Sequence, residues 1–192
     1  MSMNGINLNF TDEKARLPVG ISKMFGNPDV WDGFEWPSFT ESGEEYDLPF
    51  VCQINCEQAA AFDTENVLPK NGVLYFFYDM DGLPLEPFGS NRARVFYYDG
   101  DMAGLHQMLR TDHEGNDLCL HEVKMHFNSG ETPEGVLGQT SPEERQTLLQ
   151  LRPFQTQKLT IRFPDNGVLN FYIDKAKLAR RDFSNVIFEV KR

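Results

Sequence analysis

Two stretches of the chain are apolar at almost every position. Residues 71–79 (NGVLYFFYD) and 166–174 (NGVLNFYID) are nearly the same nine residues written twice. A strand with one solvent-exposed face alternates apolar and polar residues, whereas an unbroken run of β-branched and aromatic residues is typical of a strand covered on both faces. An Asn-Gly pair opens each copy, and glycine can take the positive φ that a tight turn demands. The pattern predicts two buried strands that begin with turns.

The similarity of the two copies continues on both sides of the strands. Pro69 and Pro164 match upstream, and a second apolar run follows each copy, at 93–98 (ARVFYY) and at 184–190 (SNVIFEV). Chance similarity does not normally extend beyond the segment that the strand pattern itself dictates. The repetition therefore indicates a tandem duplication in which each half contributes a few strands.

Short helices are expected beside these strands. Residues 48–62 read as a strand that runs into a helix with Asn55 as its N-cap, and 175–183 (KAKLARRDF) reads as one or two helical turns. Residues 141–151 (SPEERQTLLQL) begin as a helix should, with serine at the N-cap, proline next and glutamate at the third helical position. The end of this segment, TLLQL at 147–151, also aligns with FVCQI of the first half if a short gap is allowed.

These elements predict an α+β fold that is mostly β, built from two related β-rich halves within one compact domain spanning residues 1–192. The first half covers about 48–101 and the second about 147–192. Residues 17–37 lie outside the duplication and carry three Pro, three Gly and a group of aromatic residues. We call this segment the aromatic loop and expect its rings to hold it against the core.

The charge of the chain narrows the range of partners. The 192 residues are 40% hydrophobic, 12% aromatic and 24% charged, as in a folded protein, and the formal net charge is −11. Such a surface repels phosphate backbones, so nucleic-acid binding is not expected. An acidic surface serves solubility, and it also attracts a basic protein partner.

Nothing in the sequence predicts export or a membrane. No stretch reaches the roughly 20 apolar residues that a bilayer span needs, and residues 1–16 lack a basic segment followed by an apolar one. The three cysteines, Cys52, Cys56 and Cys119, are odd in number and sparse, which favours reduced thiols in a cytoplasm.

Motifs for chemistry are few, and no cofactor is predicted. The chain has no Gly-x-Ser-x-Gly, P-loop or Gly-x-Gly-x-x-Gly sequence, which lowers the expectation of an enzyme. Four carboxylates, at Asp79, Asp81, Asp99 and Asp101, follow two strands that are expected to be neighbours. They are weak candidates for a hard cation, because the closing glutamate of a calcium loop is missing and Asp and Gly are common in turns.

Histidines give a still weaker metal signal. His121 and His126 have Cys119 and His113 nearby, yet neither CxxC nor HExxH occurs. Residues 118–127 (LCLHEVKMHF) read as a strand, and positions five apart on a strand face opposite sides. A zinc site is therefore not favoured.

The best remaining candidates for contact with a ligand or partner are polar or aromatic residues in the predicted framework. They are Lys23, Trp31, Trp36, Gln53 and Asn55. The structural alternative is that the polar residues satisfy buried backbone groups or cap a helix, and that both tryptophans belong to the core. The sequence favours this alternative for each of them.

The order of several motifs resembles the YwqG-like domain family. These motifs are ISKMFGNPDVWDGFEWP (21–37), LPFVCQINC (48–56), LPKNGVLYFFYD (68–79), ARVFYYDGD (93–101) and NGVLNFYIDKAKLARRDFSNVIFEV (166–190). Members are usually longer and carry a His-Gln-Leu-Leu-Gly element, of which residues 136–139 here keep only Val-Leu-Gly-Gln. The resemblance implies a fold without supplying a catalytic residue, and some members look like immunity or accessory proteins beside bacterial toxin genes.

Two classes of function follow from these observations. The first is a cytoplasmic, non-catalytic interaction protein, of immunity type, whose acidic face binds a toxin or another basic protein. The alternative is a small-molecule-binding protein or an enzyme that uses a groove between the two halves. A deep polar cleft with Gln53, Asn55 or the Asp79/Asp99 pair would favour the alternative.

Overall fold

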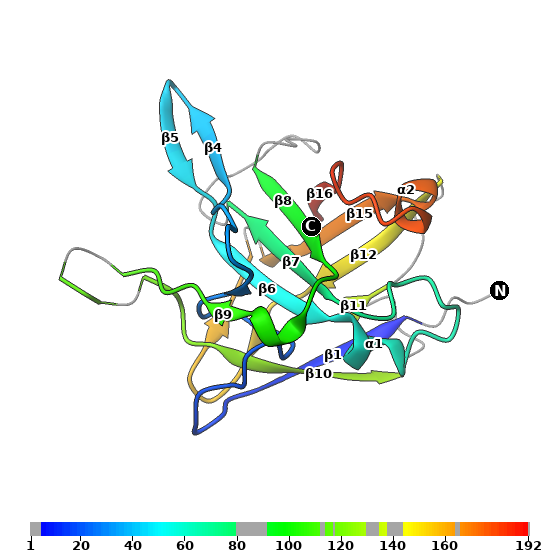
Figure 1. Ribbon diagram of the computed structural model, residues 1–192, viewed down its shortest axis with the longest axis horizontal. Coiled ribbons are helices and arrows are strands. Elements are labelled where there is room, and N and C mark those ends of the chain that lie inside the picture. Colours follow the sequence, from blue (N-terminus) through cyan, green and yellow to red (C-terminus); the bar gives the residue numbers. More distant parts are fainter. Residues whose placement is uncertain are drawn as a thin grey trace.

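A computed structural model describes residues 5–79, 92–111, 114–116, 118–129, 135–137, 144–163 and 166–191 (Figure 1). The predicted fold class is confirmed, because the chain is mostly β with only short helices. Ten strands form one sheet in which every neighbouring pair is antiparallel. In spatial order they are β16 (Ile187–Lys191), β15 (Val168–Asp174), β12 (Arg145–Leu151), β11 (Gly135–Val136), β1 (Ile6–Thr11), β10 (Val123–Ser129), β2 (Lys23–Met24), β6 (Phe50–Asn55), β7 (Val73–Tyr78) and β8 (Ala93–Tyr98).

Short strands and helices outside this sheet complete the described structure. Three two-stranded ladders pair β3 (Asp29–Val30) with β9 (His106–Gln107), β4 (Ser38–Glu41) with β5 (Glu44–Asp47), and β13 (Phe154–Gln155) with β14 (Thr160–Ile161). The helical elements whose full extent lies within the described residues are α1 (Cys56–Ala60), α2 (Lys175–Ala179) and a 3₁₀ turn at Met102–Gly104. Asn55 caps α1 as predicted, because its side chain accepts hydrogen bonds from the amides of Glu57 and Gln58.

The duplication is visible in the order of the strands. The series β6-β7-β8 forms one end of the sheet and β12-β15-β16 forms the other, so the repeated nonamers lie one strand in from each edge. The register shifts at matching places in the ladder of β6 with β7 and in the ladder of β12 with β15. The shifts lie between Phe50 and Cys52 in β6 and between Thr147 and Leu149 in β12. Both shifts lie opposite the same two positions of the nonamer. Equivalent bulges in both ladders support a common origin for the two halves.

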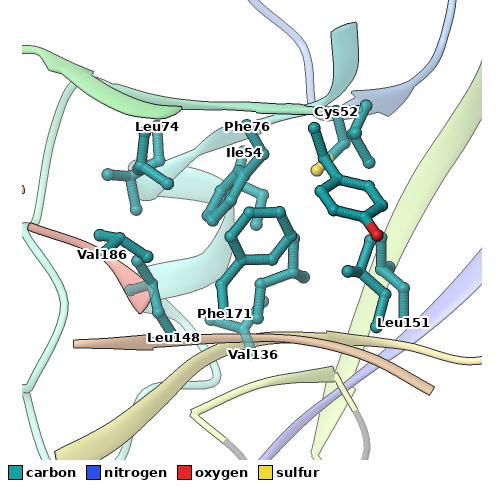
Figure 2. Close-up of a cluster of buried hydrophobic side chains, with 14 of the residues drawn as sticks. Cys52, Ile54, Leu74, Phe76, Val136, Leu148, Leu151, Phe171 and Val186 are labelled. Carbon is teal, nitrogen blue, oxygen red and sulfur yellow. The ribbon is translucent and has the colours of Figure 1, made fainter. Parts of the chain in front are cut away.

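The repeated strands meet across the main core. The rings of Phe76 and Phe171, which occupy the same position in the two nonamers, form an edge-to-face contact with centroids 5.1 Å apart. Figure 2 shows these two rings between Ile54 and Leu74 of the first half and Leu148 of the second. The sheet therefore curls until its two halves pack against each other, and apolar side chains fill the interior.

The aromatic loop covers the other face of β7. Val73, Tyr75 and Phe77 point away from the main core into a second apolar cluster, which includes Val30 and Phe34 of the loop. All six residues of β7 are buried as a result. The unbroken apolar run predicted this double coverage correctly.

One predicted helix is wrong. Residues 145–151 form strand β12, which pairs with β15 and buries most of its side chains, whereas the capping signal at 141–144 favoured a helix. Cap residues are a local preference, and the long-range ladder to β15 outweighs them. The alignment of 147–151 with the first half was the better guide. Residues 141–143, like the connection at 80–91, lie outside the described residues.

Candidate functional site

Three of the predicted site residues, Lys23, Gln53 and Asn55, come together at the junction of β2 and β6. Lys23 and Gln53 share a partner, Asp29 at the start of β3, which the sequence did not single out. Asn55 is linked to Asp29 through Gly20, whose amide donates to Asp29 Oδ2. The Lys23 Nζ lies 3.1 Å from Asp29 Oδ1, and Gln53 Nε2 donates to Asp29 Oδ2 at 2.7 Å. In return, the Asp29 amide donates to Gln53 Oε1 at 2.9 Å. Asn55 Nδ2 donates to the Gly20 carbonyl at 2.8 Å.

The charged pair at the centre of this network, Lys23 and Asp29, is buried. The side chain of Lys23 is 0% exposed and that of Asp29 is 1% exposed. Glu122 lies 3.4 Å from Lys23 Nζ, and the Tyr75 hydroxyl donates to the Asp29 carbonyl at 2.5 Å. Since these charges are paired, the network acts as a clamp that ties the aromatic loop to the sheet. Glu122 is 99 residues from Lys23 in the sequence, so no local pattern indicates that these two residues pair.

The two tryptophans are half-buried on the same side of the sheet. Trp31 stacks on Tyr98 of β8 with ring centroids 4.8 Å apart. Trp36 donates its indole N–H to the Leu48 carbonyl at 2.9 Å, and the guanidinium of Arg110 lies 4.7 Å above its ring. Trp31 therefore holds the aromatic loop against β8, while Trp36 also reaches a groove at the surface.

The aspartates considered for a cation lie apart. Because β7 and β8 are antiparallel, Asp79 after β7 and Asp99 after β8 are at opposite ends of the ladder. Asp79 forms an ion pair with Arg92, and Asp101 caps the 3₁₀ turn, while Asp81 lies outside the described residues. Within the described ranges, no three His, Cys, Asp or Glu side chains gather as a metal would require.

The histidines and cysteines also go to separate places. His126 Nε2 is 2.8 Å from the Thr11 hydroxyl, and His121 Nε2 is 3.5 Å from Asp12. His113 lies outside the described residues. Cys52 and Cys56 are fully buried, and burial raises the pKa of Cys56 to about 12, so its thiolate is scarce at neutral pH.

The charges of the chain are distributed unevenly. Between Lys23 and Lys70 there are ten Asp or Glu residues and no Lys or Arg. Four of the ten lie on the hairpin of β4 and β5, which projects from the sheet and ends in a tight turn with positive φ at Ser42 and Gly43 (Figure 1). We call residues 38–47 the acidic hairpin. All four residues of β5 are exposed.

A groove of about 370 Å³ lies at the base of this hairpin. Its apolar lining includes Phe25, Trp36 and Phe50, and its rim includes the ion pair of Asp47 and Arg110. Three leucines also protrude from the described parts of the segment 109–120, and two of them, Leu118 and Leu120, line the groove. Leu109 is 64%, Leu118 60% and Leu120 45% exposed. We call this combination of hairpin, groove and leucines the acidic-apolar surface.

A family model matches nearly the whole chain. The match falls in two segments, residues 22–136 and 132–191, and the model describes a domain of unknown function, DUF1963. The chain belongs to the DUF1963 family. The two segments agree with two related halves, since the first contains β6-β7-β8 and the second contains β12-β15-β16. A search of curated proteins gives no match to this chain.

The two halves of this DUF1963 domain also meet at the surface. A hollow of about 560 Å³ on the described surface has walls from 65–69 of the first half and from α2, Arg181 and Gln146 of the second. The predicted polar residues Gln53, Asn55, Asp79 and Asp99 do not line it. Among the described residues, no helix is long and apolar enough to cross a bilayer.

Proposed function

We propose that this DUF1963 protein is a non-catalytic interaction protein whose acidic-apolar surface binds a basic protein partner. The observation that carries the proposal is the position of exposed leucines and the acidic hairpin around one groove. Protein interfaces commonly combine an apolar centre with a polar or charged rim. The partner would present an apolar side chain flanked by Lys or Arg.

Electrostatics support this partner class. The segment between Lys23 and Lys70 holds most of the excess negative charge of the chain, and its hairpin stands clear of the sheet. A projecting cluster of one sign raises the association rate of an oppositely charged protein, and salt screens that effect. Binding should therefore weaken as ionic strength rises.

The exposed apolar side chains at the groove support a specific apolar contact with the partner in addition to attraction by charge. Exposed apolar side chains that gather beside a groove are typical of docking sites. The Trp36 ring, covered by the guanidinium of Arg110, offers the kind of aromatic and arginine pair that is enriched where binding energy concentrates.

The resemblance to the YwqG-like family adds a more specific proposal. Some members of that family look like immunity or accessory proteins beside bacterial toxin genes, and such a toxin would meet its immunity protein in the cytoplasm. We infer the same place and partner class for this chain, namely a cytoplasmic protein and a basic toxin-like chain.

The test compares two variants that lose the same charge. The first, Glu44→Gln with Glu45→Gln, removes two charges from the hairpin tip. The second, Glu57→Gln with Asp99→Asn, removes two exposed charges elsewhere. Each tagged protein is expressed in the native host, its retained partners are identified at low salt, and the affinity for the purified partner is measured from 50 to 300 mM salt.

We expect a stoichiometric basic partner whose affinity falls at least tenfold with the hairpin variant and changes little with the control. A Leu118→Ser, Leu120→Ser variant should weaken binding at every salt concentration. Equal losses in both charge variants would contradict the assigned surface. Retention of no partner at low salt would contradict the proposed function itself.

A further inference from the structure

We infer that the hollow between the two halves is a binding site for a small organic anion with an apolar body. The hollow has a volume of about 560 Å³ and lies apart from the acidic-apolar surface. It is therefore independent of the proposed protein partner. We call it the junction pocket.

The wall formed by α2 and the residues after it is basic, whereas the protein as a whole is acidic. Residues 175–181 (KAKLARR) contain four of the 18 Lys and Arg residues of a chain whose net charge is −11. Two of the four, Lys175 and Arg181, line the junction pocket and are exposed. Within the described parts of the chain, neither forms an ion pair, so both charges are free to meet an anion.

Arg181 occupies a backbone position that normally belongs to glycine. The amide of Arg181 donates to the Leu178 carbonyl and that of Asp182 to the Lys177 carbonyl, a pair of bonds that ends α2 in a Schellman motif. The residue after the C-cap then takes a left-handed conformation, here with a φ of 57° at Arg181. An arginine is disfavoured there, and such departures gather at functional sites.

The side chain of Arg181 reaches toward the first half. Its positive charge lowers the pKa of Cys56 and of Tyr97, two first-half groups in which burial is the larger effect and raises the pKa. Arg181 therefore lies at the junction of the two halves, where it lines the junction pocket together with 65–69 of the first half. Arg181 also lines the neighbouring hollow beside β8.

The remaining walls supply the apolar and amide contacts that a small organic molecule needs. Apolar surface comes from 67–69 on one side and from Leu178 and Ala179 on the other. Gln146, only 2% exposed, and Asn66 add amide groups to the same walls. One acidic residue, Glu65, lines the pocket, which leaves its lining with a net positive charge. The lining is thus divided evenly between apolar and polar residues, which suits a small ligand that carries both a charged group and an apolar body.

A matched set of probes tests the charge of the ligand. Hexyl phosphate, heptanoate, hexanol and hexylamine share one hexyl chain and differ in the head group. Binding to the full chain is measured by isothermal titration and by amide chemical shifts at low salt. Probes with about ten non-hydrogen atoms should bind in the millimolar range. We expect both anions to bind, with shifts at 65–69 and 175–181, and hexanol to bind at least tenfold more weakly.

Substitutions of two neighbouring arginines test the role of Arg181. Arg181→Gln and Arg180→Gln each remove one charge, but Arg180 does not line the pocket. We expect Arg181→Gln to weaken hexyl phosphate at least tenfold and Arg180→Gln to change it less than threefold. Arg181→Gly should abolish binding while it leaves the melting temperature equal or raises it, since glycine suits the left-handed position.

Three results would overturn the inference. They are binding of hexylamine as tight as that of hexyl phosphate, equal effects of the two glutamine variants, and no binding of either anion at about 10 mM. A melting temperature lowered by Arg181→Gly would contradict the argument that Arg181 is placed there at the expense of stability.

Discussion

At the scale of single residues, Lys23 was a candidate for contact with a ligand or partner, and its buried pair with Asp29 gives it a structural role instead. Both side chains are almost fully buried, and Gln53 bonds Asp29 from the other side. Removing charged groups from water is unfavourable, so such a network is stable only when each member has partners. The sequence could identify Lys23 and Gln53 as polar residues in a framework, but it could not reveal that Asp29 and Glu122 would meet them.

Loss of Lys23 should destabilise the protein strongly. In a Lys23→Met variant the carboxylate of Asp29 stays buried without its cation, and we expect the free energy of unfolding to fall by about 3 kcal/mol. Urea denaturation at pH 7 measures the change. The control, Lys14→Met, alters an exposed lysine and should shift stability by less than about 0.5 kcal/mol. Similar effects of both variants would contradict the clamp.

The buried thiol of Cys56 and the buried phenol of Tyr78 predict how stability depends on pH. Burial raises the pKa of Cys56 from 9.0 to about 12 and that of Tyr78 from 10.0 to about 12. Below pH 9 these groups are protonated in both states, so their contribution to stability is complete. Above pH 9 the unfolded chain loses protons that the folded protein keeps, and stability falls.

For one such thiol the loss approaches about 1.4 kcal/mol per pH unit between its unfolded and folded pKa values. Urea midpoints at pH 8, 9.5 and 10.5 should therefore decrease steadily. A Cys56→Ala variant is expected to show a shallower decrease than wild type. Midpoints that stay constant over this range would contradict the prediction.

At the scale of elements, identical local sequence does not fix identical geometry. Both nonamers begin with Asn-Gly, and the expected positive φ is found at Gly72 in the first copy, with a value of 85°. In the second copy it is Asn166 that has a positive φ, of 52°. Asparagine tolerates the left-handed region better than other side chains, so either residue of the pair can serve the turn. The surrounding contacts choose between them.

A Gly72→Ala substitution should therefore be costly. A Cβ at this position would lie 2.2 Å from the carbonyl oxygen of Tyr98, and the positive φ adds strain. We expect a loss of more than about 2 kcal/mol, measured by urea denaturation. Gly104→Ala is the control, because nothing lies within 4 Å of the added atom. Equal stability of both variants would show that the turn relaxes freely.

At the scale of the whole molecule, the two halves share one core. Phe76 and Phe171 come from equivalent strands at opposite ends of the sheet and touch edge to face. Neither half can bury its apolar face without the other, so we expect a single cooperative unfolding transition. Tryptophan fluorescence reports on the aromatic loop, which packs against β7 and β8 of the first half, and far-ultraviolet circular dichroism reports on the whole chain, so their midpoints should coincide.

A double-mutant cycle tests the contact between the halves directly. With Phe76→Leu and Phe171→Leu, we expect a coupling energy of about 0.5 to 1.5 kcal/mol, as for other edge-to-face pairs. Phe39→Leu combined with Phe171→Leu is the control pair, because Phe39 belongs to the second apolar cluster. That pair should be additive within about 0.5 kcal/mol. Additivity of the first pair would show that the halves do not stabilise each other through these rings.

The sequence by itself determined the features that depend on neighbouring residues. It was sufficient for the double burial of β7, the cap of α1 by Asn55, the existence of two related halves and the formal net charge of −11. Each follows from periodicity, side-chain chemistry or repetition along the chain.

The tertiary structure decided whatever depends on pairing between distant segments. Residues 145–151 became a strand because β15 was available as a partner, and Asp79 was separated from Asp99 because β7 and β8 run antiparallel. The acidic-apolar surface and the junction pocket unite residues from opposite parts of the chain. Long-range contacts, which no local pattern encodes, bring these groups together.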